Sequence, residues 1–141
     1  MASYLSTYLS KKILDFILTH TAYSPPATLY FALFTVRPAA DGTGGTEVTI
    51  GSNNYSRLAV LANTYNFPGA SVVSGIENSL NGAILSFATP SGAWGTVVAI
   101  AILDASTAGN FLWIGDLASS ISPTSGIQPA ILIGKLAITQ T

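Results

Sequence analysis

The chain has 141 residues, about the size of one domain, with five basic and six acidic residues and a formal net charge of −1. So few basic residues exclude a protein that binds the nucleic-acid backbone, which needs a clustered basic face. Apolar residues make up 49% of the chain, but its longest apolar stretch, Val97–Leu103, is far shorter than the roughly 20 residues that span a bilayer, so no membrane contact is expected. Without cysteine, disulfides cannot stabilise the core.

Charged residues are unusually scarce. They make up 8% of the chain, against about 25% in a typical soluble domain. The cores of protein interfaces are depleted in charge, and a weakly charged surface makes a poorly soluble monomer. We therefore expect a homo-oligomer, with a trimer as the expected state, that buries uncharged faces between its subunits.

Residues 3–20 predict one N-terminal amphipathic helix with Ser3 as its N-cap. Its apolar stripe recurs at three- and four-residue spacing and comprises Leu5, Leu9, Ile13 and Phe16. Pro25 and Pro26 prevent the helix from continuing. Because Tyr8, Ile17 and Leu18 make the helix apolar on more than one side, we predict that it is an attachment or assembly element. The alternative is that it covers the open end of its own β domain.

After the prolines the hydrophobic period changes to two, and Gly, Pro and Asn separate short apolar segments. Thr28–Val36 is apolar on both faces, which is typical of a central, doubly covered strand. The other predicted strands are residues 55–62, 76–80, 83–87, 94–103, 111–117, 128–133 and 135–139. Asn81-Gly82 predicts a two-residue hairpin between the strands on either side of it.

These elements predict a mainly β fold. Regularly spaced strands with turn residues between them are typical of an antiparallel β-sandwich or a jelly-roll-like barrel. No linker divides the sequence, so residues 1–141 form a single domain, with the helix at about 3–20 and the β domain at about 28–139.

No set of residues predicts catalysis, a cofactor or a metal, so we expect no enzyme. The single histidine, His20, has no second histidine or cysteine with which to form a metal site; at the end of the helix its charge favours the helix dipole and its ring packs on the core. Asp41 and Glu47 flank a glycine-rich loop and could meet over a calcium ion, but Asp before Gly is more typical of an ordinary turn. Gly42-Thr43-Gly44-Gly45 lacks the Lys-Ser/Thr of a phosphate-binding loop.

Four segments resemble a family of small tailed-bacteriophage proteins, often labelled tail-fibre-like and found among virion genes. The segments are residues 21–35, residues 45–48 with 55–57, residues 94–97, and residues 104–112. The resemblance implies a virion component without catalysis. Tyr55 and Arg57 match the family's Tyr-x-Arg motif, which we interpret as a contact at the start of a strand. The apolar residues 98–102 depart from the more polar segment of many relatives.

The composition and the resemblance together predict a non-enzymatic structural protein of a tailed-phage virion, assembled in the cytoplasm of the bacterial host. The short chain favours a capsid decoration (cement) protein that binds the major capsid protein. A tail fibre or baseplate component that binds tail proteins is the first alternative. A carbohydrate-binding module that stacks sugars on Tyr30, Tyr55, Trp94 and Trp113 is the second. The predicted assembly interface comprises Leu5, Leu9, Ile13, Phe16, Tyr55, Arg57, Trp94 and Trp113.

Overall fold

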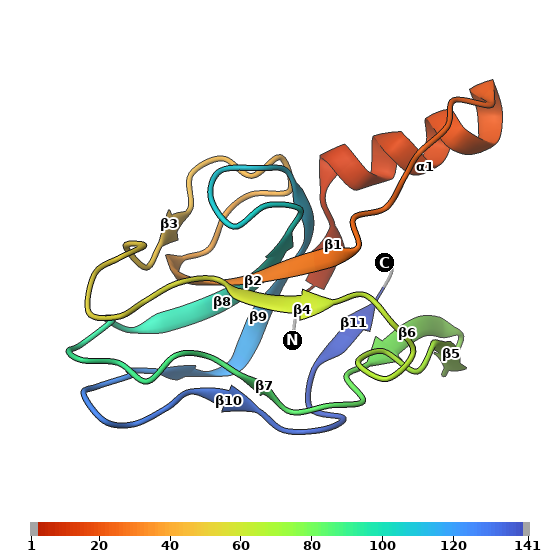
Figure 1. Ribbon diagram of the computed structural model, residues 1–141. Coiled ribbons are helices and arrows are strands. Elements are labelled where there is room, and N and C mark those ends of the chain that lie inside the picture. The colour runs from red at the N-terminus through yellow and green to blue at the C-terminus, as the bar shows by residue number, and fades with distance from the viewer. Residues whose placement is uncertain (1–2, 140–141) are drawn as a thin grey trace.

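The computed structural model describes residues 3–139, which form a mainly β fold with one N-terminal helix (Figure 1). The largest sheet is antiparallel and six-stranded, in the order β1-β9-β8-β2-β3, with β4 also paired to β2. Its strands are β1 (Ser3–Leu5), β2 (Thr28–Val36), β3 (Thr46–Glu47), β4 (Leu58–Leu61), β8 (Val97–Leu103) and β9 (Phe111–Ile121). As predicted, Thr28–Val36 is a central strand.

Two small antiparallel sheets form the second layer, and the strands do not close into a barrel. One sheet pairs β7 (Leu85–Ser86) with β10 (Ala130–Ile131). The other has the order β11-β6-β5, with β5 at Ala70–Val73, β6 at Ile76–Leu80 and β11 at Ala137–Thr139. Figure 1 shows both small sheets below the main sheet. The predicted sandwich is therefore confirmed.

The core lies between these layers. Alternate residues of β2, including Phe31 and Leu33, point into it, as do Ile100 and Ile102 of β8. The second layer contributes Leu85, Phe87 and Leu136. The opposite face of the main sheet carries a second buried cluster, in which three alanines lie beside Phe34, Leu103 and Ile114, and Tyr4, Val98 and Phe111 pack against it. A strand buried on both faces needs apolar residues at every position, which explains the unbroken apolar run of β8.

The helix begins later than predicted. α1 spans Thr7–Thr19, and its N-cap is Ser6 rather than Ser3. Ser3–Leu5 instead forms β1 and pairs with Gly115, Ile114 and Trp113 of β9. The Ser6 hydroxyl accepts a hydrogen bond from the Leu9 amide at 3.0 Å and donates one to the Phe111 carbonyl oxygen. Strand pairing and this buried cap therefore override the helical spacing of Leu5.

The predicted hairpin at Asn81-Gly82 is wrong. β6 pairs with β5 and β11, whereas β7 pairs with β10. The actual turn is Ser74-Gly75, where both residues have positive φ (52° and 79°), as a two-residue hairpin with matched twist requires. The sequence analysis missed β5, because the Ser74-Gly75 turn that joins it to β6 is a weaker hairpin signal than Asn-Gly.

Asn81 instead has a buried side chain that connects separate segments by hydrogen bonds. Its side-chain amide donates to the carbonyl oxygens of Ala83 and Leu132 at 2.8 and 2.9 Å, and its Oδ1 accepts from the Leu136 amide at 2.9 Å. This one side chain thus joins the chain after β6 to the segment between β10 and β11. Its neighbour Gly82 lies against Tyr65 and Pro68, where an added Cβ would lie 2.5 Å from the Tyr65 carbonyl oxygen.

We predict that Asn81→Ala lowers the free energy of unfolding by about 2–3 kcal/mol, because it leaves the buried Leu136 amide and the Ala83 carbonyl oxygen without these hydrogen-bond partners. Urea unfolding followed by tryptophan fluorescence measures this. The matched control is Asn78→Ala, because Asn78 makes one exposed hydrogen bond of 3.3 Å to Ser71; its effect should stay below about 0.5 kcal/mol. Equal losses of stability in the two variants would contradict a stabilising role for the Asn81 hydrogen bonds.

Candidate functional site

Three of the predicted interface residues lie in the protein's own core. Tyr55, Trp94 and Trp113 are 1%, 5% and 1% exposed. The Tyr55 and Trp94 rings meet edge-to-face with centroids 5.0 Å apart, and the Trp94 Nε1 donates to the Asn53 carbonyl oxygen at 2.9 Å. Buried rings with satisfied polar atoms stabilise the sandwich, and these three side chains belong to its core. They are also unavailable as a sugar-stacking platform.

The Tyr-x-Arg motif forms a buried polar network. Arg57 makes two parallel hydrogen bonds to the Glu47 carboxylate, Nε to Oε1 at 2.8 Å and Nη2 to Oε2 at 2.7 Å, and only 5% of its side chain is exposed. The Tyr55 hydroxyl donates to Glu47 Oε1 at 3.2 Å and accepts from the Leu33 amide at 2.8 Å. Hydrogen bonding to Glu47 raises the pKa of Arg57 above its already high value. The motif therefore joins β2 to β3, and Arg57 directly precedes β4.

Arg57 also fixes the loop of residues 104–110. Its Nη1 donates to the carbonyl oxygens of Ala105 and Ala108, each at 2.8 Å. Within the loop, the Asp104 carboxylate accepts hydrogen bonds from the backbone and side-chain amides of Asn110 at 2.7 and 2.8 Å. The cationic group thus satisfies backbone carbonyls at a turn where Ala108 has a positive φ of 50°.

The two acidic residues that flank the glycine-rich loop, Asp41 and Glu47, have separate partners. The Asp41 carboxylate accepts from the backbone amide and hydroxyl of Thr43 at 3.0 and 2.7 Å, and these hydrogen bonds lower the pKa of Asp41. Glu47 is held by Arg57. Asp41 therefore has the turn role that its sequence favoured, and no cluster of three or more metal-ligating side chains occurs within residues 3–139.

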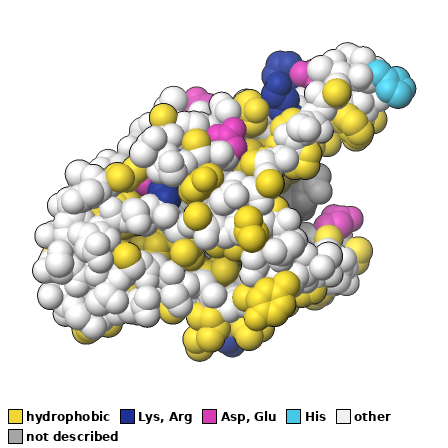
Figure 2. Space-filling view, in the orientation of Figure 1, with side chains coloured by type: hydrophobic (Ala, Val, Ile, Leu, Met, Phe, Trp, Pro, Cys, Tyr) yellow, Lys and Arg dark blue, Asp and Glu magenta, His cyan; other side chains and the backbone are white. Residues whose placement is uncertain are grey.

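The helix forms a projecting arm, which we define as α1 together with His20. Figure 1 shows it extending from one end of the molecule, with residues 21–27 returning along it. Only its root packs on the body, where Tyr8 and Leu9 contact the core alongside Leu5 of β1. His20 is exposed at the tip in a left-handed conformation (φ 56°), so its ring does not pack on the core as expected (Figure 2).

The apolar residues of the arm are largely uncovered. Ile13 is half-buried and Phe16 is 56% exposed. Leu14, Ile17 and Leu18 are 57%, 64% and 74% exposed. Figure 2 shows apolar atoms along the lower side of the arm and the lysines on its upper side. The predicted apolar stripe therefore has two parts. Leu5 and Leu9 pack against the core, whereas Phe16 is exposed. Leu14, which was not part of the predicted stripe, is exposed beside it. Within the residues described, no helix has the length and apolarity needed to span a membrane.

We predict that Arg57→Ala destabilises the protein by about 3–5 kcal/mol, because it leaves the largely buried Glu47 carboxylate without its counter-ion. Differential scanning calorimetry measures the loss. Lys11→Ala is the matched control, since Lys11 pairs with Asp15 on the exposed helix surface and its removal should cost less than about 0.5 kcal/mol. A small effect of Arg57→Ala would show that the network is not essential for the fold.

We also predict a loss of stability at alkaline pH that depends on Tyr55. Burial raises the pKa of the Tyr55 phenol well above its ordinary value of about 10. The unfolded chain therefore releases this proton first, and stability falls as the pH rises above 10. Tyr55→Phe should be less stable than the wild-type protein at neutral pH. Above pH 10, however, the free energy of unfolding of the variant should fall less steeply than that of the wild type, by up to about 1.4 kcal/mol per pH unit. Urea unfolding at several pH values measures the slope, and identical slopes would contradict the prediction.

A family model described as podophage GP4 fiber I protein gp80 matches residues 4–139, nearly the whole chain. No curated protein matches the sequence significantly. The match confirms the resemblance to small tailed-phage virion proteins with a tail-fibre-like label. The chain is therefore a phage structural protein and belongs to the Gp80 family of podophage fibre proteins.

Proposed function

We propose that this protein is a non-catalytic component of a podophage fibre, assembled in the host cytoplasm and carried on the virion as a homo-oligomer, with a trimer as the expected state. The family match supports the fibre assignment, because the description of the family names a fibre protein. For this reason we place the fibre ahead of the capsid decoration that chain length favoured. Its proposed partners are tail proteins, and the major capsid protein is the alternative partner.

The observation that carries the proposal is the projecting arm. Its outer half exposes four large apolar side chains and packs on nothing within residues 3–139 beyond the returning segment. An isolated helix of 13 residues is marginal in water, and soluble monomers rarely expose a contiguous patch of this kind without a partner. The arm is thus well suited to joining the subunit to an assembly.

The location on the particle can be tested by separating tails from tailless capsids and quantifying the protein in each by mass spectrometry. We expect it in the tail fraction at a constant ratio to other tail proteins. Recovery with the capsid shells alone would overturn the fibre assignment in favour of decoration.

The role of the arm can be tested in the same particles. The double variant Ile17→Ser, Leu18→Ser removes two exposed apolar side chains without touching the core, so the variant should fold but be incorporated into virions at least about tenfold less. The control is Thr19→Ser, at the exposed end of the same helix, which should be incorporated normally. Circular dichroism of both purified variants checks that they are folded, and normal incorporation of the double variant would refute an assembly role for the arm.

A further inference from the structure

A polar hollow of about 280 Å³ lies at the root of the arm. Three segments form it: the start of α1, the loop between β2 and β3, and the end of the loop between β8 and β9. Figure 1 shows both loops beside the root of α1. Exposed polar side chains of the lining are Asp41, Thr43 and Asn110, and carbon atoms come from Tyr8, Ala40 and Phe111. The hollow therefore offers both hydrogen-bonding groups and apolar contacts to a ligand.

Hydrogen bonds and close packing fix these three segments relative to one another. The Thr7 amide donates to the Ala40 carbonyl oxygen at 2.8 Å, and the Ser6 hydroxyl donates to the Phe111 carbonyl oxygen. Gly42, which has a φ of 85°, lies so close to the Phe111 ring that an added Cβ would be 2.6 Å from its Cδ2 atom. A site whose walls are already held in place loses little conformational entropy when a ligand binds.

Two of the lining side chains are held in place and still have a free oxygen. Oδ1 of Asp41 accepts hydrogen bonds from Thr43, and Nδ2 of Asn110 donates to Asp104 at 2.8 Å. The other oxygens, Oδ2 of Asp41 and Oδ1 of Asn110, accept no hydrogen bond from any group within residues 3–139. Because both side chains are exposed, these oxygens can accept hydrogen bonds from a ligand.

Charge and polarity narrow the class of ligand. Hydrogen bonds from Thr43 lower the pKa of Asp41, so its carboxylate is charged at neutral pH. Among the residues described, no Lys, Arg or His lines the hollow, and Lys12 packs over the Tyr8 ring outside it. An anionic ligand would therefore be repelled. A wholly apolar ligand would remove water from the two free oxygens without replacing its hydrogen bonds. The ligand that fits is uncharged and has hydroxyl groups to donate.

We propose that this hollow binds one ring of a neutral saccharide. Sugar hydroxyl groups donate to the free oxygens of Asp41 and Asn110, while the C–H groups of the ring contact Phe111 and Ala40. A cavity of about 150 Å³ holds a benzene-sized ring, so a hollow of nearly twice that volume accommodates a six-membered ring with its hydroxyl groups. The inference goes beyond the proposed function and does not depend on it, because the site lies within a single chain.

NMR titration of the full chain, labelled with ¹⁵N, tests the proposal. The probes are the methyl glycosides of glucose, galactose, mannose, rhamnose and N-acetylglucosamine. We expect at least one of them to shift the amide signals of Thr43, Gly109 and Asn110, with a dissociation constant on the order of 1–10 mM, because a single sugar ring has few atoms with which to bind. Methyl glucuronide, which carries a carboxylate, should bind more weakly than methyl glucoside, and the reverse order would overturn the inference of a neutral ligand.

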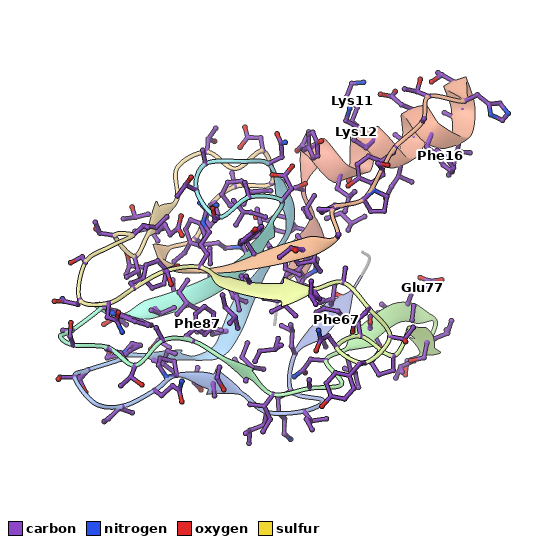
Figure 3. All side chains as sticks on the ribbon, in the orientation of Figure 1. Lys11, Lys12, Phe16, Phe67, Glu77 and Phe87 are labelled. Atoms are coloured by element: carbon purple, nitrogen blue, oxygen red, sulfur yellow. The ribbon has the colours of Figure 1, made fainter. Side chains whose placement is uncertain are left out.

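The variant Asp41→Asn tests the acceptor. Asparagine keeps an oxygen for Thr43 but replaces the free carboxylate oxygen by an amide group, so the dissociation constant should rise at least about fivefold while the variant stays folded. The matched control is Glu77→Gln, which removes the same charge from β6, a strand that Figure 3 shows well away from the two loops. This control should bind as the wild type does.

Three outcomes would overturn the proposal: no shift with any of the five neutral glycosides, shifts confined to another surface, or unchanged binding by Asp41→Asn. Loss of binding in Glu77→Gln would likewise place the sugar elsewhere. None of these outcomes depends on whether the protein is recovered with tails or with capsids, so the fibre proposal is tested separately.

Discussion

The fold depends on one buried ion pair, between Glu47 and Arg57. Two segments without regular structure meet at this pair: the segment between β3 and β4, which holds Arg57, and the loop of residues 104–110. A carboxylate and a guanidinium taken out of water together are stable only when their remaining donors and acceptors are satisfied. Here Tyr55 and two backbone carbonyl groups supply those hydrogen bonds. The geometry of β2, β3 and the loop is thereby fixed at one point, in a chain that has few other charges with which to do so.

This arrangement also explains how a chain with so few charges folds to a single structure. Apolar packing alone tolerates many arrangements of similar energy, whereas a polar network with every member satisfied permits few. Asn81 plays the same part in the second layer, where its hydrogen bonds to Leu132 and Leu136 join segments that are far apart in the sequence. The rare polar residues of the interior therefore determine which strands become neighbours, and the abundant apolar residues supply most of the stabilisation.

The sequence predicted those features that depend on local pattern. The doubly buried strand β2, the apolar strand β8, the single helix and the sandwich all follow from the pattern of apolar residues, and each is present. The errors arose where distant partners decide. Ser3 and Leu5 fit a helix equally well, but β9 pairs with them; Asn81-Gly82 fits a hairpin, but Leu132 and Leu136 bind the asparagine. Likewise, aromatic residues on strands are compatible with core or interface, and only the fold shows that Tyr55, Trp94 and Trp113 are core. For the arm, the breadth of its apolar surface was visible in the sequence, but its projection from the body was not.

The buried cap at Ser6 has a mechanical consequence. The hydroxyl that begins α1 is bonded to the carbonyl oxygen of Phe111, at the first residue of the longest strand of the main sheet, and β1 just before it is paired along the same strand. On its N-terminal side, the arm is therefore attached directly to the main sheet, without a flexible segment between them. A force applied at its outer end is transmitted into β9 and from there into β8 and β2. A subunit built in this way can bear tension through its stiffest element, while its loops remain free to vary in sequence.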